Sequence, residues 1–203
     1  MTEDEARAWI EHRFDAQACA RLERFLNLVI AENGRQNLVS PTTLDRIWSR
    51  HAVDSAQLLE LAPPGWNSWI DVGTGGGFPG MVAALLAPGR AVSLVEPRRK
   101  RADFLEACCT EFQLEHADVY ACKIESVEVR ADVISARAVA STENLLRSAG
   151  HCAKSGTTWL LPRGRSGSDD IARLARLKQT MFHVEHSVTD AESTIIVATG
   201  NGR

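Results

Sequence analysis

The stretch WIDVGTGGGFPGMVAALL, residues 69–86, decides the fold of this 203-residue chain. An apolar run with an acid near its end is followed by a cluster of glycines and a second apolar run. This order is typical of a strand, a tight turn and a helix. Glycine adopts positive φ freely and has no Cβ, so the backbone of such a turn can lie directly against a ligand. Pro79 fits the first helical turn, where its missing N–H breaks no hydrogen bond. We therefore expect a ligand site at this turn.

Strands and helices alternate beyond the turn. Strand-like runs are WIDV, AVSLVE, ADVYACK, ADVISAR and TTWLLP, and helices are predicted between them at about 79–87, 98–113 and 142–150. This alternation predicts a mainly parallel sheet covered on both faces, an α/β fold. A helix near 168–178 then precedes MFHVEHSV and STIIVATG. Because only TDAE separates these two runs, we expect a C-terminal antiparallel hairpin.

The first 62 residues read as helices. One apolar stripe has the i, i+3, i+4, i+7, i+8 spacing of a buried helix face: Leu22, Phe25, Leu26, Val29 and Ile30. A third helix is predicted after Ser40 and Pro41, carrying Ile47, Trp48, His51, Leu58 and Leu59. The chain is therefore expected to have a helical extension, 1–62, packed on an α/β domain, 63–203.

Composition narrows the class of protein. Hydrophobic residues make up 44% and charged residues 24%, as in ordinary globular proteins. The net charge of −3 argues against a protein that coats nucleic acid, although PRRKR (97–101) and RGR (163–165) are local basic candidates. No apolar run approaches the roughly 20 residues that span a bilayer. The acidic, amphipathic N-terminus predicts neither a signal nor a transit peptide, so we expect a cytoplasmic protein without a membrane partner.

Cysteine and histidine give no metal pattern. Five cysteines without a C-x-x-C pair are typical of reduced thiols. HVEH, with His183 and His186, suggests zinc, but in a strand these two side chains point to opposite faces. No third ligand lies nearby in the sequence, so no metal is expected.

The glycine pattern itself fits two ligands. Residues 71–77 match the acid-x-G-x-G-x-G pattern of enzymes that use S-adenosylmethionine, whereas residues 75–80 match the G-x-G-x-x-G of dinucleotide sites. In either case Glu96, at the end of the next strand, is placed to bind a ribose. Asp71, positioned to approach the cationic methionine end, and the closing hairpin favour the methyl donor. An NAD-dependent oxidoreductase remains the alternative.

Several further segments carry a family resemblance. NLVSPTTLDRIWSRHAVDS, DVGTGGGFPG, VEPRRKRADFL and ISARAVA, in this order over Asn37 to Arg163, together resemble the RsmG (GidB) family. The resemblance implies a Rossmann-like class I methyltransferase fold and methylation of N7 of a guanine in the 530 loop of 16S ribosomal RNA. It implies S-adenosyl-L-methionine as cofactor and 16S ribosomal RNA, or the small ribosomal subunit, as partner. We expect a monomer.

The resemblance also implies site residues. The cofactor-binding set is Gly73, Phe78, Glu96, Ile124, Glu125 and Arg137. Arg137, beside the transferable methyl group, is the catalytic candidate. Arginine commonly pairs with guanine O6 or N7, and a contact at O6 would leave N7 free to react.

Two further residues are substrate-binding candidates. His51 lies one helical turn from Asp54, which fits either a structural hydrogen bond or a wall of the substrate mouth. Arg163 stands in LPRG where the family commonly has LKG, and arginine differs from lysine in hydrogen-bond geometry. A non-catalytic scaffold that binds S-adenosylmethionine is the third hypothesis.

Local motifs indicate which kind of atom is methylated. The [DN]-P-P-[YF] motif typical of amine methylation does not follow the fourth strand, and no Pro-Cys pair offers the nucleophile typical of pyrimidine C5 methylation. Guanine N7 has an in-plane lone pair and no proton to remove. Such a reaction depends on positioning rather than on a general base.

Overall fold

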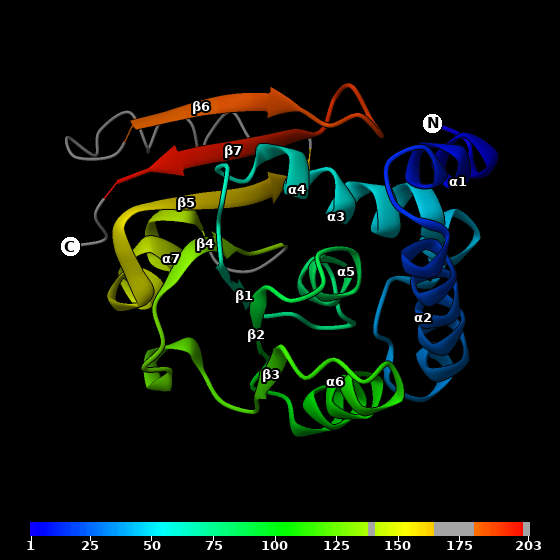
Figure 1. Ribbon diagram of the computed structural model, residues 1–203, viewed down its shortest axis with the longest axis horizontal. Coiled ribbons are helices and arrows are strands. Elements are labelled where there is room, and N and C mark those ends of the chain that lie inside the picture. Colours follow the sequence, from blue (N-terminus) through cyan, green and yellow to red (C-terminus); the bar gives the residue numbers. More distant parts are fainter. Residues whose placement is uncertain (138–140, 165–180, 201–203) are drawn as a thin grey trace.

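A seven-stranded sheet forms the centre of the computed structural model, which describes residues 1–137, 141–164 and 181–200 (Figure 1). Its order is β3-β2-β1-β4-β5-β7-β6. The strands are β1 (Ser68–Val72), β2 (Ala91–Val95), β3 (Ala117–Tyr120), β4 (Ala131–Ser135), β5 (Ala153–Arg163), β6 (Met181–His186) and β7 (Thr194–Thr199). β1 to β5 pair in parallel, whereas β7 pairs antiparallel with β5 and β6. The predicted parallel sheet with a C-terminal antiparallel hairpin is thus confirmed.

Both faces of the sheet bury apolar side chains. Because successive residues of a strand point to opposite faces, Trp69 and Leu160 join one apolar cluster while Ile70 and Trp159 join the other. α5 (Gly80–Leu86) and α6 (Arg99–Glu111) cover the first face, and α7 (Thr142–Ala149) covers the second (Figure 1). These helices agree with the three predicted between the strands. The helix predicted near 168–178 lies outside the described residues.

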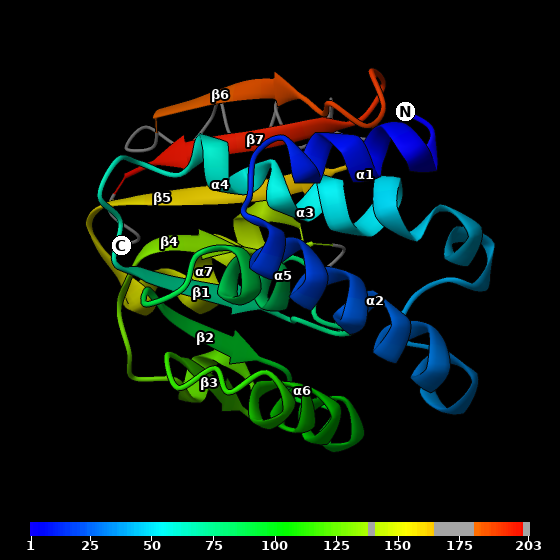
Figure 2. The same cartoon turned by 45° about the vertical axis from the view of Figure 1, so that its right-hand side comes forward.

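Two N-terminal helices extend the core of the first face. α1 (Glu3–Glu11) is followed by α2 (Ala16–Gln36), and α2 packs against α5 and α6 (Figure 2). Phe25 and Leu26 of α2 belong to the same apolar cluster as Leu94 of β2. The helices therefore share one core with the sheet, while the boundary at residue 62 stays a prediction.

The apolar stripe of α2 is shorter than predicted. Leu22, Phe25, Leu26 and Val29 are buried, but Ile30 is 44% exposed. At 3.6 residues per turn, Ile30 lies about 80° around the helix from Leu22. This angle carries its side chain past the edge of the packed face, so the prediction that Ile30 is core was wrong.

The third helical segment is present but irregular. It consists of a 3₁₀ helix η1 (Pro41–Arg46), a π-helix η2 (Trp48–Val53) and the short α3 (Asp54–Ala56) and α4 (Leu58–Leu61). Glu3 of α1 accepts hydrogen bonds of 2.9 Å from the backbone N–H groups of Trp48 and Ser49. These bonds fix the start of the π-helix, a winding often found at functional sites. Within the described residues, no helix is long and apolar enough to cross a membrane.

Candidate active site at the carboxyl ends of the parallel strands

The loop between β1 and α5 is a tight glycine turn. Gly73, Gly75 and Gly77 have φ of 71°, 60° and 100°, values that favour glycine. The N–H of Gly73 donates to the carbonyl of Val95 over 2.8 Å, which ties the turn to β2. A Cβ on Gly77 would lie 2.5 Å from Phe25 Cζ. Backbone conformation and close packing therefore both require this glycine-rich sequence.

Glu96 connects the same turn to the end of β2. Its side chain is buried, at 3% exposure. Glu96 Oε2 accepts from the N–H of Gly75 over 2.9 Å, and Oε1 accepts from the N–H of Arg98 over 2.8 Å. Each carboxylate oxygen can accept a second hydrogen bond. The predicted pairing of a glycine turn with an acid at the end of the next strand is therefore present in space.

Asp71 is held inside the fold by hydrogen bonds to neighbouring elements. Its side chain is completely buried. Asp71 Oδ2 accepts from the N–H of Gly80 over 2.9 Å, and Oδ1 accepts from Ser135 Oγ over 2.7 Å. Ser135 Oγ in turn accepts from Trp69 Nε1 over 2.7 Å. Burial raises the pKa of Asp71 to about 6. The residue braces β1, β4 and the start of α5 from inside the fold.

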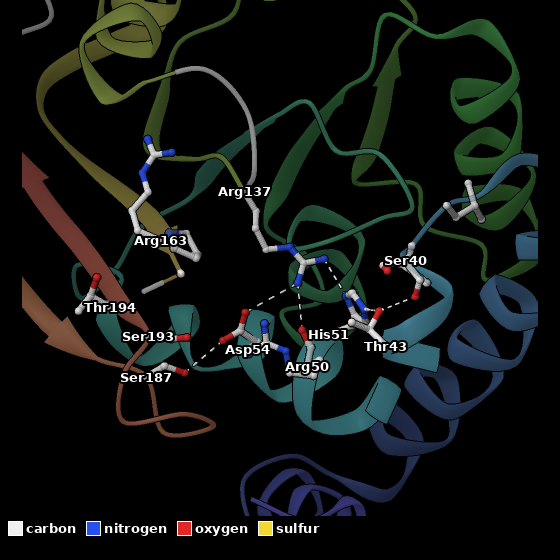
Figure 3. A pocket seen from close by; sticks show the side chains of 14 residues that line it. Ser40, Thr43, Arg50, His51, Asp54, Arg137, Arg163, Ser187, Ser193 and Thr194 are labelled. Atoms are coloured by element: carbon white, nitrogen blue, oxygen red, sulfur yellow. Dashed lines mark hydrogen bonds and ion pairs between the residues drawn. The ribbon is translucent and has the colours of Figure 1, made fainter. Parts of the chain in front are cut away.

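Arg137 follows β4 and is held from several sides (Figure 3). Its Nη2 donates to His51 Nδ1 over 2.9 Å, and its Nη1 donates to the carbonyl of Arg50 over 3.1 Å. Asp54 Oδ2 lies 3.7 Å from the same Nη1. The guanidinium carbon lies 5.2 Å from the ring centroid of Phe78, at the glycine turn. The irregular third helix therefore supplies three of the groups that orient this arginine.

The partners of His51 define its protonation. Since Arg137 donates to Nδ1, the ring proton is on Nε2, which donates to Thr43 Oγ1 over 2.8 Å. Thr43 Oγ1 donates onward to the carbonyl of Ser40 over 2.7 Å. Burial, followed by the charges of Arg137 and Arg50, lowers the pKa of His51 to about 3. His51 is thus a neutral, buried group that holds Arg137.

A cavity of about 460 Å³ opens beside Arg137. Arg50, Arg137 and Arg163 line it together with Asp54, so cationic side chains outnumber anionic ones among the described lining residues (Figure 3). Leu38 also lines the cavity and packs against Gly76, which places the cavity beside the glycine turn. Arg163 Nη2 donates to Thr142 Oγ1 over 2.9 Å.

The predicted site residues fall into two groups in space. His51, Arg137 and Arg163 line the cavity, while Gly73, Phe78 and Glu96 lie at or beside the glycine turn. Two more, Ile124 and Glu125, begin the 3₁₀ helix η3 (Ile124–Ser126) after β3, with Ile124 buried and Glu125 exposed. β3 pairs in parallel with β2, so they lie toward the same end of the sheet as Glu96.

Sequence reasoning missed three hydroxyl groups of the site. Thr43 accepts from His51, and Ser187 and Thr189 lie against Asp54. Ser187 and Thr189 follow β6, far from Asp54 in the sequence, and no local motif marks them. Only the antiparallel hairpin, once placed beside β5, brings them to the site.

Sequence comparisons give a consistent family. A family model described as GidB, rRNA small subunit methyltransferase G, matches residues 18–195. The ribosomal RNA small subunit methyltransferase G of Erythrobacter litoralis is 43% identical over 203 residues, covering 100% of this chain and 98% of the relative. The protein of the same name from Sphingopyxis alaskensis is 45% identical over 199 residues, covering 96% of this chain and 85% of the relative.

Solved structures show the same fold at low identity. An O-methyltransferase from Bacillus cereus, in complex with SAH, has a TM-score of 0.60 at 18% identity and covers 89% of this chain and 90% of its own. A second structure, from Klebsiella pneumoniae, has a TM-score of 0.63 at 16% identity, with the same coverage. The fold is therefore that of class I methyltransferases.

Proposed function

Because the chain belongs to the GidB family of small-subunit ribosomal RNA methyltransferases, we propose that it methylates N7 of a guanine in the 530 loop of 16S ribosomal RNA. The methyl donor is S-adenosylmethionine, as in the family. The observation that carries the proposal is Arg137, fixed by His51, Arg50 and Asp54 where the cavity meets the glycine turn. Family membership also removes the NAD-dependent alternative.

The residues at the glycine turn fit a nucleoside-containing donor. The turn presents backbone with positive φ, and Glu96 stands beside it with carboxylate oxygens able to accept from ribose hydroxyls. We infer that Gly73, Phe78 and Glu96 hold the donor, with Ile124 and Glu125 next to the adenine. When bound, S-adenosylmethionine supplies a methyl group on a positively charged sulfur.

The cavity suits a reaction that needs no proton transfer. In methylation at N7, a bond forms between the guanine nitrogen and the methyl carbon while the carbon–sulfur bond breaks. The N7 lone pair supplies the electrons, and no proton leaves. Among the described lining residues, His51 is neutral and hydrogen-bonded at both nitrogens, and Asp54 is held beside Arg137. Positioning alone can supply on the order of 7–11 kcal/mol of rate acceleration.

Arg137 has donors left for the guanine. A guanidinium carries five N–H groups, and the bonds to His51 and Arg50 use two of them. A further N–H directed at O6 would hold the base and leave N7 free. We infer that Arg137 is the catalytic residue in this positioning sense, and that Arg163, on the same cavity, meets the RNA.

Radiolabelled methyl transfer tests the proposal. Small ribosomal subunits from a strain that lacks this gene are incubated with the protein and labelled S-adenosylmethionine, and the labelled nucleotide is mapped. We expect label on N7 of the 530-loop guanine and its loss in Arg137→Ala. Arg147→Ala, at an exposed arginine of α7, is the matched control and should label normally. Label at another atom, or near-normal turnover of Arg137→Ala, would contradict the assignment. Donor binding without any label would favour the non-catalytic scaffold.

A further inference from the structure

The turn between β6 and β7 is fastened to the helical segment that carries His51 and Asp54. Gln57 Nε2 donates to Ser187 Oγ over 3.0 Å, and the N–H of Val188 donates to Gln57 Oε1 over 3.0 Å. Ser187 is 6% exposed and Gln57 is 3% exposed, so these bonds are buried. The C-terminal hairpin and the N-terminal helical segment therefore meet through specific polar contacts at the cavity.

The same contacts converge on one oxygen of Asp54. Ser187 Oγ lies 3.1 Å from Asp54 Oδ1, Thr189 Oγ1 lies 3.2 Å from it, and Gln57 Nε2 lies 3.1 Å from it. The other oxygen, Oδ2, lies 3.7 Å from Arg137 Nη1 (Figure 3). Ser187 Oγ and Thr189 Oγ1 also lie 2.8 Å apart, so one hydroxyl donates to the other while the second donates to Oδ1. The two hydroxyls and Gln57 together fix the rotation of the carboxylate, which leaves Oδ2 facing the guanidinium.

We propose that Ser187, Thr189 and Gln57 are positioning residues for methyl transfer, acting on Arg137 through Asp54. His51 and the carbonyl of Arg50 orient the guanidinium from one side, and Asp54 is its charged partner on another. An ion pair at 3.7 Å constrains direction only if the carboxylate itself is fixed, and the two hydroxyls and Gln57 fix it. This inference rests on the proposed function, because it assigns the hairpin turn a role in that same reaction.

The expected effect on the rate follows from the sensitivity of group-transfer reactions to the positions of the reacting groups. A displacement of about 1 Å at a reacting group can lower a rate by about 100-fold. Among the described residues, removal of the two hydroxyls leaves the Gln57 amide as the side-chain donor to Asp54 Oδ1. We expect the turnover number to fall by about tenfold or more in Ser187→Ala/Thr189→Val, with a smaller change in KM for the ribosomal subunit.

The matched control changes the same turn without touching Asp54. Val188 lies between the two hydroxyl residues, and its side chain is 48% exposed. Val188→Ala keeps the backbone N–H that donates to Gln57, so it should keep the wild-type turnover number. Ser187→Ala/Thr189→Ser differs from the double variant only in keeping a hydroxyl at position 189, and it should recover most of the lost rate. No recovery with serine would overturn the proposal.

A double-mutant cycle separates positioning from general support of the hairpin. Single-turnover rates are measured for Asp54→Ala alone and combined with Ser187→Ala/Thr189→Val, alongside thermal melting of each variant. If the hydroxyls act through Asp54, their removal costs little further rate once Asp54 is absent. Equal fold-losses in both backgrounds would overturn the proposal. If the wild-type protein labels no RNA, both the proposed function and this inference are wrong. If the wild-type protein labels RNA and the hydroxyl variants label it equally fast, only this inference is wrong.

Discussion

Gly80 begins α5 against the buried side chain of Asp71. A Cβ at this position would lie 2.5 Å from Leu94 Cδ2 and 2.6 Å from Asp71 Cβ. Neither atom is free to withdraw, because both belong to buried residues of the sheet. We expect Gly80→Ala to lower the free energy of unfolding by about 2 kcal/mol or more, measured by urea denaturation.

Gly34 gives the control for this substitution. It lies in α2, and no atom comes within 4 Å of an added Cβ. Alanine is the better helix former, so Gly34→Ala should raise the free energy of unfolding by about 0.5 kcal/mol. Equal effects of the two substitutions on the free energy of unfolding would contradict a steric cost of a side chain at position 80.

Asp71 and His51 give the protein opposing pH dependences. Burial raises the pKa of Asp71 from 3.8 to about 6, so between these values the folded state keeps a proton that the unfolded state has lost. Stability then falls as the pH rises through this range. The pKa of His51 is lowered from 6.5 to about 3, so the unfolded state keeps the proton instead and stability rises with pH. Between about pH 4 and pH 6 the two contributions offset each other.

Single substitutions should separate these contributions. As the pH rises from about 4 to about 6, we expect His51→Gln to lose stability, because the contribution of Asp71 is no longer offset by that of His51. Asp71→Asn should gain stability over the same range, because the contribution of His51 remains. Each unit of pKa difference is worth about 1.4 kcal/mol, so opposite slopes are measurable by urea denaturation at the two pH values. Slopes of the same sign in both variants would contradict the assignment of these two shifts.

Two substitutions in α2 test how far the buried apolar face of this helix extends. Leu26 is 1% exposed within the core cluster, whereas Ile30, one turn later, is 44% exposed. Leu26→Ala should lower the free energy of unfolding by about 2–5 kcal/mol, since a cavity remains in the core. Ile30→Ala should change it by less than about 0.5 kcal/mol. Denaturant midpoints measure both, and comparable losses would place Ile30 in the core after all.

The sequence predicts elements better than it predicts contacts between them. β1, the glycine turn and α5 follow from local rules, because apolar runs and glycine placement act over a few residues. The direction of the Asp71 side chain does not follow from local rules, because its hydrogen-bond partners Ser135 and Gly80 belong to other elements. His51 was found by spacing and family resemblance, yet its bond to Arg137 depends on a π-helical winding that periodicity does not reveal.

Charge over the whole chain also differs from charge at the cavity. The net charge is −3, whereas the cavity collects Arg50, Arg137 and Arg163 from three separate parts of the sequence. Folding therefore makes a local cationic surface that composition hides. An RNA partner would be attracted to this surface rather than to the molecule as a whole.

Binding of the donor and global stability are linked in this fold, because the glycine turn exists only when β1, β2 and α5 are assembled. S-adenosylhomocysteine, which has the same ribose and adenine as the methyl donor, should bind the folded chain and not the unfolded chain. At a concentration about 100 times its Kd it should raise the free energy of unfolding by about 2.7 kcal/mol. Glu96→Gln should reduce this increase at the same ligand concentration, since it removes the carboxylate that we propose accepts from the ribose. Glu128→Gln, at an exposed glutamate beyond η3, is the matched control and should keep the full increase. Thermal melting with and without ligand measures all three proteins, and an undiminished increase in Glu96→Gln would remove Glu96 from the donor site.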